Sequence, residues 1–386
     1  MRRLIASSLV ILFSLSAAAD EPISLDQKIG QLLMVSLPEG DLDSEAMAAT
    51  LENITAGRIG AVIFFNFNIR EADAFRTVNA HIASLAKPYP LLMAIDEEGG
   101  RVRRLRKRLG YREFPGARKV AEKLTPIAAH GIYLEMADQI ADLHLNVNLA
   151  PVVDLDIRPS NPVIGRLGRS FSDDPQVVMD YARAFIDAHR ELGVLTVLKH
   201  YPGHGSSKGD SHAGITEITH TWRPVELVPF RNLIEANEAD MIMTGHLLDR
   251  NVDAELPASL SQQHVQVRLR DDLGFDGVVI TDDLQMGAIV DEYSLEERIV
   301  LALESSSDIL QFSDPASLAD DFPREFATIV KDAIATGQLT TEQIDAAFQR
   351  VITLKYRLID PAGIPMIVNL PYRGDTPCPV DTLSLP

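Results

Sequence analysis

The sequence has a single cysteine, Cys378, a single tryptophan and 6% aromatic residues in a chain of 386 residues. One thiol excludes both an intramolecular disulfide and a cysteine metal cluster. Basic residues are also few, because lysine and arginine total 36 against 55 aspartate and glutamate residues, for a formal net charge of −19. This charge argues against nucleic acid as the main partner, since phosphate binding requires a basic surface.

The remaining composition is that of a globular protein. Hydrophobic residues make up 46% and charged residues 24%, which is enough apolar material for a large core and excludes a disordered or collagen-like chain. After the start of the chain, no apolar stretch reaches the roughly 20 residues that a membrane-spanning helix needs. We therefore expect no stable membrane insertion of the mature protein.

The N-terminus has the pattern of a secretory signal. Arg2 and Arg3 precede an apolar run at residues 4–15, and small residues follow at positions 16–19. A basic start, a short apolar segment and small residues at its end are typical of a cleaved signal peptide, and an uncleaved anchor is the alternative. We expect residues 1–19 to be a signal peptide that is removed, and the protein to be exported to the periplasm or secreted.

Short apolar runs alternate with amphipathic segments along the chain. The runs predict eight strands, at residues 32–36, 61–65, 91–95, 145–149, 194–198, 241–244, 277–281 and 309–312. The segments between them predict helices at residues 72–85, 127–143, 176–192, 225–237, 262–273 and 295–303. Runs that are apolar on both faces indicate a parallel sheet covered on both sides. Eight such units predict an α/β fold of the (β/α)8 TIM-barrel type, although a doubly wound open sheet has the same local pattern.

One domain accounts for this pattern. Two further helices are expected at residues 325–336 and 341–358, where they close the barrel, with Thr340 or its neighbour as an N-cap. We therefore assign residues 20–359 to a single catalytic domain. The remaining residues, 360–386, are rich in proline and glycine and are expected to form a C-terminal tail.

Polar residues come directly after five of the predicted strands. They are Asp96, Asp154, Lys199 with His200, His246 and Asp282. In a (β/α)8 barrel the catalytic groups lie at the C-terminal ends of the strands. We therefore expect these side chains to meet at one end of the barrel.

The most informative stretch is residues 199–212. Its glycines and proline interrupt helix and strand, so we expect a loop that positions polar side chains. Asp210 and His212 are close enough in the chain to pair, with the carboxylate raising the pKa of an imidazole that already titrates near neutrality. The alternatives are a metal site or a purely structural turn, and the spacing matches no standard zinc pattern.

Three other stretches carry candidate groups. Asp282 follows a buried strand, which suits a nucleophile or a metal ligand, whereas Asp283 could cap the next segment. Residues 96–108 combine acids, two glycines and a basic run. This combination suits the binding of sugar hydroxyls through Asp96. The alternative is that the basic run is only a solvated surface. Residues 165–171 form a glycine-rich loop with two arginines that lacks the ending of a P-loop.

Taken together, these stretches resemble glycoside hydrolase family 3, and within it the single-domain β-N-acetylglucosaminidases. The shared motifs are Asp-Gln-Glu-Gly-Gly-Arg-Val at residues 96–102, Gly-Arg-Ser-Phe at 168–171, Lys-His-Phe-Pro-Gly-His-Gly at 199–205, Asp-Ser-His at 210–212 and Ser-Asp-Asp-Leu-x-Met at 281–286. The chain departs from these motifs by Glu97 in place of glutamine, Tyr201 in place of phenylalanine and Thr281 in place of serine. The resemblance extends over residues 25–358.

The resemblance implies a retaining, exo-acting β-N-acetylhexosaminidase that forms a covalent glycosyl-enzyme and needs neither metal nor cofactor. Its substrate would carry a terminal β-linked N-acetylglucosamine, as peptidoglycan fragments and chitooligosaccharides do. Asp282 would be the nucleophile, and His212 the acid/base with Asp210 as its partner. The terminal sugar would be bound by Asp96, Arg104, Arg169, Lys199 and His200. A carbohydrate is thus the expected partner, and a monomer the expected state.

Several alternatives stay open. Two-domain β-glucosidases of the family carry the acid/base glutamate on a later domain, so the Asp-Ser-His motif favours the hexosaminidase. A phosphorylase would use the same residues with phosphate in place of water. Two further alternatives do not use the family mechanism. One is a non-catalytic sugar-binding barrel, and the other is a metal-dependent hydrolase that uses the histidines of residues 199–212. A secretory signal is also unusual here, since the peptidoglycan-recycling members of the subgroup are cytoplasmic.

Overall fold

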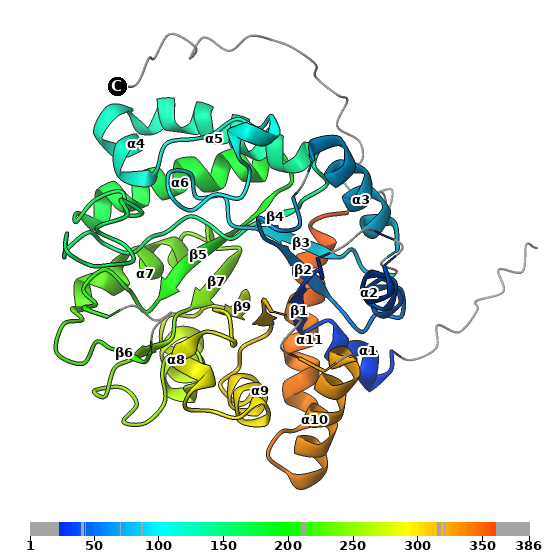
Figure 1. Cartoon of the computed structure of the whole chain (residues 1–386). Coiled ribbons are helices and arrows are strands. Elements are labelled where there is room, and N and C mark those ends of the chain that lie inside the picture. The colour runs from blue at the N-terminus through cyan, green and yellow to red at the C-terminus, as the bar shows by residue number, and fades with distance from the viewer. Residues whose placement is uncertain are drawn as a thin grey trace, which may run out of the picture.

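The computed structural model describes residues 23–39, 42, 44–69, 71–85, 88–209, 214–314, 318–319 and 321–359. Its centre is a ring of parallel strands with helices around it (Figure 1). The strands of the ring are β1 (Leu33–Ser36), β2 (Ala61–Phe64), β3 (Leu92–Ile95), β4 (Val147–Asn148), β5 (Leu195–Tyr201), β7 (Met241–Thr244), β9 (Val278–Thr281) and β10 (Leu310–Phe312). Each of the eight overlaps a strand predicted from the sequence.

The strands follow one another around the ring in chain order. The hydrogen-bonded order is β10-β1-β2-β3-β4-β5-β7-β9, with parallel pairing throughout. The two ends of this series meet through a parallel bridge between Ile280 and Ile309, and the Thr281 N–H donates to the Ile309 carbonyl oxygen at 3.0 Å. This contact confirms the (β/α)8 barrel and excludes the open doubly wound sheet.

Helices cover the outside of the ring (Figure 1). They are α1 (Leu25–Gly30), α2 (Glu45–Thr55), α3 (Ala72–Leu85), α4 (Ala117–Lys123), α5 (Pro126–Asp142), α6 (Pro175–Glu191), α7 (Val228–Glu235), α8 (Gly287–Val290), α9 (Leu295–Glu304), α10 (Phe322–Thr336) and α11 (Thr341–Tyr356). Thr340 caps α11 in a capping box with Gln343, as predicted for the second closing helix. No described helix is long and apolar enough to cross a membrane.

One predicted helix begins with a 3-10 turn, and another is a π-helix instead of an α-helix. The segment predicted at residues 225–237 is a 3-10 turn, η2 (Pro224–Leu227), followed by α7. Pro229 lies in the first turn of α7, where its missing N–H leaves no helical hydrogen bond unmade. The segment predicted at residues 262–273 is a π-helix, η3 (Gln263–Asp272). A short 3-10 turn, η1 (Lys107–Leu109), and the strand pair β6 (Thr216–Glu217) and β8 (Leu247–Leu248) complete the described elements.

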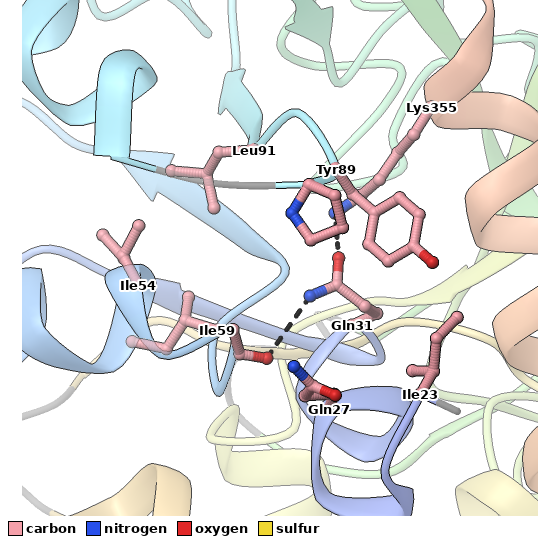
Figure 2. Close-up of a pocket in the computed structure, with 10 residues that line it drawn as sticks. Ile23, Gln27, Gln31, Ile54, Ile59, Tyr89, Leu91 and Lys355 are labelled. Carbon is pink, nitrogen blue, oxygen red and sulfur yellow. Dashed lines mark hydrogen bonds between the residues drawn. The ribbon is translucent and has the colours of Figure 1, made fainter. Parts of the chain in front are cut away.

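A small pocket lies at the N-terminal end of the strands. It is lined mainly by apolar side chains together with Gln27, Gln31 and Lys355 (Figure 2). The Lys355 ammonium group is fully buried and donates to Gln31 Oε1 at 2.6 Å and to the Gly60 carbonyl oxygen at 2.7 Å. Asp282, the predicted nucleophile, follows the C-terminal end of β9 and so belongs to the opposite end of the barrel.

Candidate active site

The C-terminal ends of the barrel strands carry the predicted polar residues. Strand β3 ends at Ile95 and is followed by Asp96, and strand β9 ends at Thr281 and is followed by Asp282. Strand β5 continues beyond its apolar run and includes Lys199 and His200. The barrel therefore brings together residues that are far apart in the sequence, as expected from the strand pattern.

Asp96 lies between two cations. Its Oδ1 accepts a hydrogen bond from Lys199 Nζ at 2.9 Å, and its Oδ2 accepts one from Arg104 Nη2 at 2.7 Å. Burial alone would raise the pKa of this carboxyl group, but the charges of Lys199 and Arg104 outweigh burial and hold the pKa of Asp96 well below its usual range. Asp96 is therefore an ionised acceptor, and its side chain is 14% exposed.

Glu98 extends this network to Arg169. The Arg169 guanidinium group donates from Nε and Nη2 to the two Glu98 oxygens, each at 2.8 Å, and Lys199 Nζ lies 2.8 Å from Glu98 Oε1. Burial raises the pKa of Glu98, yet Arg169 and Lys199 lower it to about 2. Two carboxylates thus share Lys199, and three cations balance them at the end of the barrel.

His200 connects the network to Asp154. Its Nδ1 lies 2.7 Å from Asp154 Oδ2, and its Nε2 lies 3.3 Å from Arg169 Nη2. Arginine can only donate, so both contacts are satisfied when the proton is on Nδ1 and Nε2 accepts. The backbone N–H groups of His200 and His204 also donate to Asp154 Oδ1, at 3.1 and 2.7 Å. Asp154 therefore fixes the orientation of the imidazole and the start of the loop after β5.

Tight backbone contacts fix the loop after β3. Gly99 has a φ of +82°, and a Cβ at this position would lie 2.5 Å from the Pro115 carbonyl oxygen, so only glycine fits. Next to it, the fully buried Glu97 accepts hydrogen bonds through Oε2 from the backbone N–H groups of Arg104 at 2.9 Å and Leu105 at 3.0 Å. These bonds turn the chain back so that the Arg104 side chain reaches Asp96.

Asp282 differs from the other carboxylates in keeping one oxygen free of the protein. Its Oδ1 accepts from the Asp283 N–H at 2.8 Å, whereas Oδ2 has no hydrogen-bond partner among the described residues. Asp282 is half-buried. Burial raises its pKa, but the electrostatic interaction with His246 and the hydrogen bond from the Asp283 N–H hold the pKa of Asp282 below its usual value. The side chain is thus ionised and accessible, as a nucleophile has to be.

The loop after β5 is held from two sides. On one side, Asn161 Nδ2 donates to the His204 carbonyl oxygen at 2.7 Å and to Ser207 Oγ at 3.0 Å. On the other side, Glu226 Oε2 accepts from the Ser206 N–H at 3.1 Å. Gly205 permits the close approach to the barrel, because a Cβ there would lie 1.8 Å from the Leu155 carbonyl oxygen. The main chain is therefore fixed just before the predicted acid/base residue.

Asp210 and His212 themselves lie outside the described residues. Within the described part, no group of three or more histidine, cysteine or acidic side chains is arranged to hold a metal ion. The imidazole Nδ1 atoms of His200 and His204 instead contact Asp154 and Ser207, each at 2.7 Å.

Comparison with known families agrees with this arrangement. Residues 24–354 match the glycosyl hydrolase family 3 N-terminal domain. The chain belongs to glycosyl hydrolase family 3. The match covers most of the chain.

Named relatives in the family support this placement. The chain is 31% identical to beta-hexosaminidase A of Pseudoalteromonas piscicida, over 92% of this chain and 64% of that protein. It is 33% identical to beta-hexosaminidase LpqI of Mycobacterium tuberculosis, over 86% of this chain and 83% of that protein. The chain thus spans less than two thirds of the length of the Pseudoalteromonas protein and most of the length of the mycobacterial one.

Solved structures of the family share the barrel. A family 3 beta-N-acetylglucosaminidase from Paenibacillus sp. FPU-7 superposes with a TM-score of 0.79 at 30% identity, over 94% of this chain and 66% of that chain. A beta-N-acetylhexosaminidase from Beutenbergia cavernae superposes with a TM-score of 0.78 at 30% identity, over 86% of this chain and 99% of that chain.

All five residues expected to bind sugar from the family 3 resemblance lie in one network in the structure. The sequence marks no role for Glu98, and Asp154 stands out in it only by its place after a predicted strand. Asn161 and Glu226 were not noted at all. No local pattern marks them, because they act on main-chain atoms of a loop 20 or more residues away.

Proposed function

We propose that the protein is a retaining, exo-acting β-N-acetylhexosaminidase that releases terminal β-linked N-acetylglucosamine from peptidoglycan fragments or chitooligosaccharides. The observation that carries the proposal is the Asp282 carboxylate after β9, which is half-buried, has a pKa below its usual value and keeps one oxygen without a hydrogen bond among the described residues. The names of the family relatives support the N-acetylhexosamine specificity.

The proposed reaction has two displacement steps. In the first, Asp282 Oδ2 attacks the anomeric carbon while His212 protonates the leaving oxygen, so that the glycosidic bond breaks and a glycosyl ester forms. In the second, His212 takes a proton from water, which attacks the same carbon and releases the sugar with its β configuration retained. Asp210 orients the imidazole. A histidine suits this double role because it exchanges a proton near neutral pH.

The network at the end of the barrel suits the binding of the terminal sugar. Asp96 presents an ionised acceptor, and Arg104 and Lys199 present donors, one at each oxygen of that carboxylate. A sugar hydroxyl both donates and accepts hydrogen bonds, so it fits between such groups. Arg169 and His200 complete the set. We propose that the protein acts as a monomer, because every residue in the scheme comes from one chain.

The first test is hydrolysis of aryl β-glycosides of N-acetylglucosamine, N-acetylgalactosamine and glucose, with and without phosphate. Preferential hydrolysis of the N-acetylated sugars, at a rate independent of phosphate, is expected. Sugar 1-phosphate as the product would instead establish a phosphorylase, and faster cleavage of the glucoside would establish a β-glucosidase. Loss of activity with a chelator, restored by zinc, would establish a metal-dependent hydrolase. No cleavage of any of them would favour a sugar-binding barrel.

Two variants test the roles. Asp282→Ala is expected to lower kcat at least about a thousandfold, and added azide is expected to restore turnover with formation of the α-glycosyl azide. His212→Ala is expected to slow substrates with poor leaving groups far more than activated aryl glycosides. Equal losses on both classes of substrate would contradict the acid/base role.

We also propose that the protein is exported, on the strength of the charge and apolar pattern of residues 1–19. Fractionation of cells that express the full chain, with N-terminal sequencing of the product, tests this proposal. A cytoplasmic protein that retains Met1 would contradict it.

A further inference from the structure

His246 is the polar residue that follows strand β7, and it takes no step in the proposed reaction. It is fully buried, and both of its ring nitrogens have partners. Nε2 lies 2.8 Å from the carbonyl oxygen of Asp283, and Nδ1 lies 2.7 Å from Ser259 Oγ. A carbonyl oxygen only accepts hydrogen bonds, so the neutral ring carries its proton on Nε2. The Ser259 hydroxyl group then donates to Nδ1.

The carbonyl group that His246 holds belongs to the residue after the proposed nucleophile. The Asp283 N–H donates to Asp282 Oδ1 at 2.8 Å, and the Asp282 N–H donates to the Thr244 carbonyl oxygen at 2.9 Å. The end of β7 thus holds the loop after β9 at two points, one before and one after the peptide bond between Asp282 and Asp283. Because the N–H of that peptide bond holds Oδ1, its orientation decides where Oδ2 points.

Ser259 is itself fixed by the loop that carries it. It is fully buried, between β8 and η3. The Ala258 N–H donates to the Leu247 carbonyl oxygen at 2.8 Å, and Ser261 Oγ donates to Asp253 Oδ2 at 2.7 Å. The chain is therefore held close to Ser259 on both sides, and the Ser259 hydroxyl group fixes the plane of the imidazole.

The loop after β9 has a second attachment, on the side of β10. The Leu284 N–H donates to the Gln311 carbonyl oxygen at 2.9 Å, and the Ser313 N–H donates to Asp283 Oδ1 at 3.2 Å. Loss of the bond from His246 should therefore leave the loop in place and free only its β7 side. Both ring nitrogens of His246 are engaged by the protein, which argues against a direct part in proton transfer or sugar binding.

We propose that His246 is a positioning residue for the nucleophile. Its Nε2–H holds the Asp283 carbonyl oxygen so that Asp282 Oδ2 faces the anomeric carbon, and Ser259 holds the His246 ring in the required orientation. This inference rests on the proposed function, since it assigns two further residues to the same reaction. His246 acts on the attack by Asp282, and not on sugar binding or on departure of the leaving group.

Two variants at position 246 separate this hydrogen bond from the rest of the ring. His246→Gln places an amide N–H near the position of Nε2, so it keeps the bond to Asp283. His246→Asn is the matched control, because its shorter amide group reaches the position of Nδ1 and meets Ser259 but not Asp283. Both variants replace the ring by a neutral amide, so a purely structural role of the ring would affect them alike.

The readout is the rate at which Asp282 becomes glycosylated. A fluorinated N-acetylglucosaminyl fluoride has a good leaving group and gives a glycosyl ester that hydrolyses slowly, so mass spectrometry of the intact protein follows the attack itself. His246→Asn is expected to lower the labelling rate about tenfold to a hundredfold. His246→Gln is expected to keep the rate within about threefold of that of the unmodified enzyme.

Two further measurements show that the attack, and no other step, is affected. In His246→Asn, kcat should fall by the same factor for aryl N-acetylglucosaminides with good and with poor leaving groups. The inhibition constant of free N-acetylglucosamine, which reports sugar binding, should change by less than about twofold.

Ser259→Ala tests the second part of the proposal. It is expected to lower the labelling rate about threefold to tenfold, because the His246 ring loses one of its two hydrogen bonds. In the His246→Gln background the same substitution is expected to change the rate by less than about twofold, because the amide that contacts Asp283 does not depend on Ser259.

The failures of the two proposals are distinguishable. Equal losses in His246→Asn and His246→Gln would overturn this inference and leave the proposed function standing. A loss that grows as the leaving group becomes poorer, or weaker inhibition by N-acetylglucosamine, would also overturn it. Neither labelling nor hydrolysis by the unmodified enzyme would refute both proposals. If His246→Asn does not fold, Ser259→Ala decides alone, because labelling at the unmodified rate would overturn the inference.

Discussion

The side chain of Asn161 holds the main chain of His204: Asn161 Nδ2 lies 2.7 Å from the His204 carbonyl oxygen. The same amide group donates to Ser207 Oγ, and its Oδ1 accepts from the N–H groups of Val163 and Ile164. Asn161 is fully buried. One side chain thereby ties the loop after β4 to the loop after β5, which leads to the predicted acid/base residue.

Replacing Asn161 is expected to affect acid catalysis. Asn161→Ala removes several buried hydrogen bonds at about 1 kcal/mol each, so we expect a loss of about 2–4 kcal/mol of stability. We further expect kcat on substrates with poor leaving groups to fall at least about tenfold more than kcat on activated aryl glycosides. Urea denaturation and leaving-group kinetics measure the two effects.

Asn161→Asp is the comparison variant, because it keeps the acceptor for the Val163 and Ile164 N–H groups and removes the donor to His204, Gly205 and Ser207. It should show the same dependence on the leaving group with a loss of stability at least as large, because a buried carboxylate oxygen then faces the His204 and Gly205 carbonyl oxygens. Equal losses on good and poor leaving groups in both variants would assign Asn161 a structural role alone.

Asp96 and Glu98 both contact Lys199. The second partner of Asp96 is Arg104, whereas that of Glu98 is Arg169. Asp96→Asn leaves Lys199 paired with Glu98 at 2.8 Å, so the variant should remain folded. Loss of one charged hydrogen bond costs about 1.5–3 kcal/mol, so we expect kcat/KM for an aryl N-acetylglucosaminide to fall about tenfold to a hundredfold. Steady-state kinetics and thermal unfolding of the variant test this prediction.

Glu98→Gln serves as the comparison. Both oxygens of Glu98 are occupied by Arg169 and Lys199, and its side chain is only 6% exposed. Breaking such a buried pair costs about 3–5 kcal/mol, so this variant should lose stability as well as activity. Asp96→Asn with unchanged kinetics would exclude Asp96 from the sugar-binding site.

The strands were predictable because a barrel strand is apolar on both faces, and such runs stand out in a sequence. The limits of this signal are visible at β5, which extends to Tyr201, beyond the predicted end at residue 198. Lys199 and His200 end the apolar run, yet both side chains are buried by ion pairs rather than by hydrophobic contact. Apolarity alone cannot find a strand end that is buried in this way.

The short helices were not predicted for a related reason. Helix α4 has seven residues, Ala117–Lys123, and its N-cap residue Gly116 makes no side-chain hydrogen bond, so neither length nor capping marks it. Helix α2 buries only two apolar side chains, Met47 and Ile54. Both helices are stabilised by their place on the barrel, which is a property of the tertiary structure.

Glu97 gives a prediction about pH and stability. Burial raises the pKa of Glu97 to about 7, although the N–H groups of Leu105 and Arg104 oppose the rise. Between about pH 4.5 and 7 the unfolded chain is ionised at this residue while the folded chain is protonated, so stability falls as pH rises. The loss above pH 7 amounts to about 3 kcal/mol.

Glu97→Gln, which restores the family's usual residue, removes this loss. The glutamine carbonyl oxygen still accepts from Arg104 and Leu105, so the loop should keep its shape. We expect the variant to gain stability relative to the unmodified protein as pH rises from about 5 to about 8, by up to about 3 kcal/mol. Urea denaturation at both pH values measures the gain. If the difference in free energy of unfolding between the variant and the unmodified protein does not change with pH, the raised pKa of Glu97 is contradicted.

Lys355 gives the opposite dependence at the other end of the barrel (Figure 2). Burial lowers its pKa to about 7, and its two hydrogen-bond partners, Gln31 and the Gly60 carbonyl, are uncharged. Between about pH 7 and 10.5 the unfolded chain keeps the proton while the folded chain loses it, so stability rises with pH across this range. The full rise corresponds to about 5 kcal/mol.

Lys355→Met removes the buried charge together with its hydrogen bonds. The free energy of unfolding of the variant, relative to that of the unmodified protein, should therefore be highest at about pH 6 and decrease towards about pH 9. Urea denaturation at the two pH values measures this change, with the exposed Lys123→Met as the control whose difference stays constant. If the free energies of unfolding of both variants differ from that of the unmodified protein by amounts that do not change with pH, Lys355 keeps its proton in the folded protein.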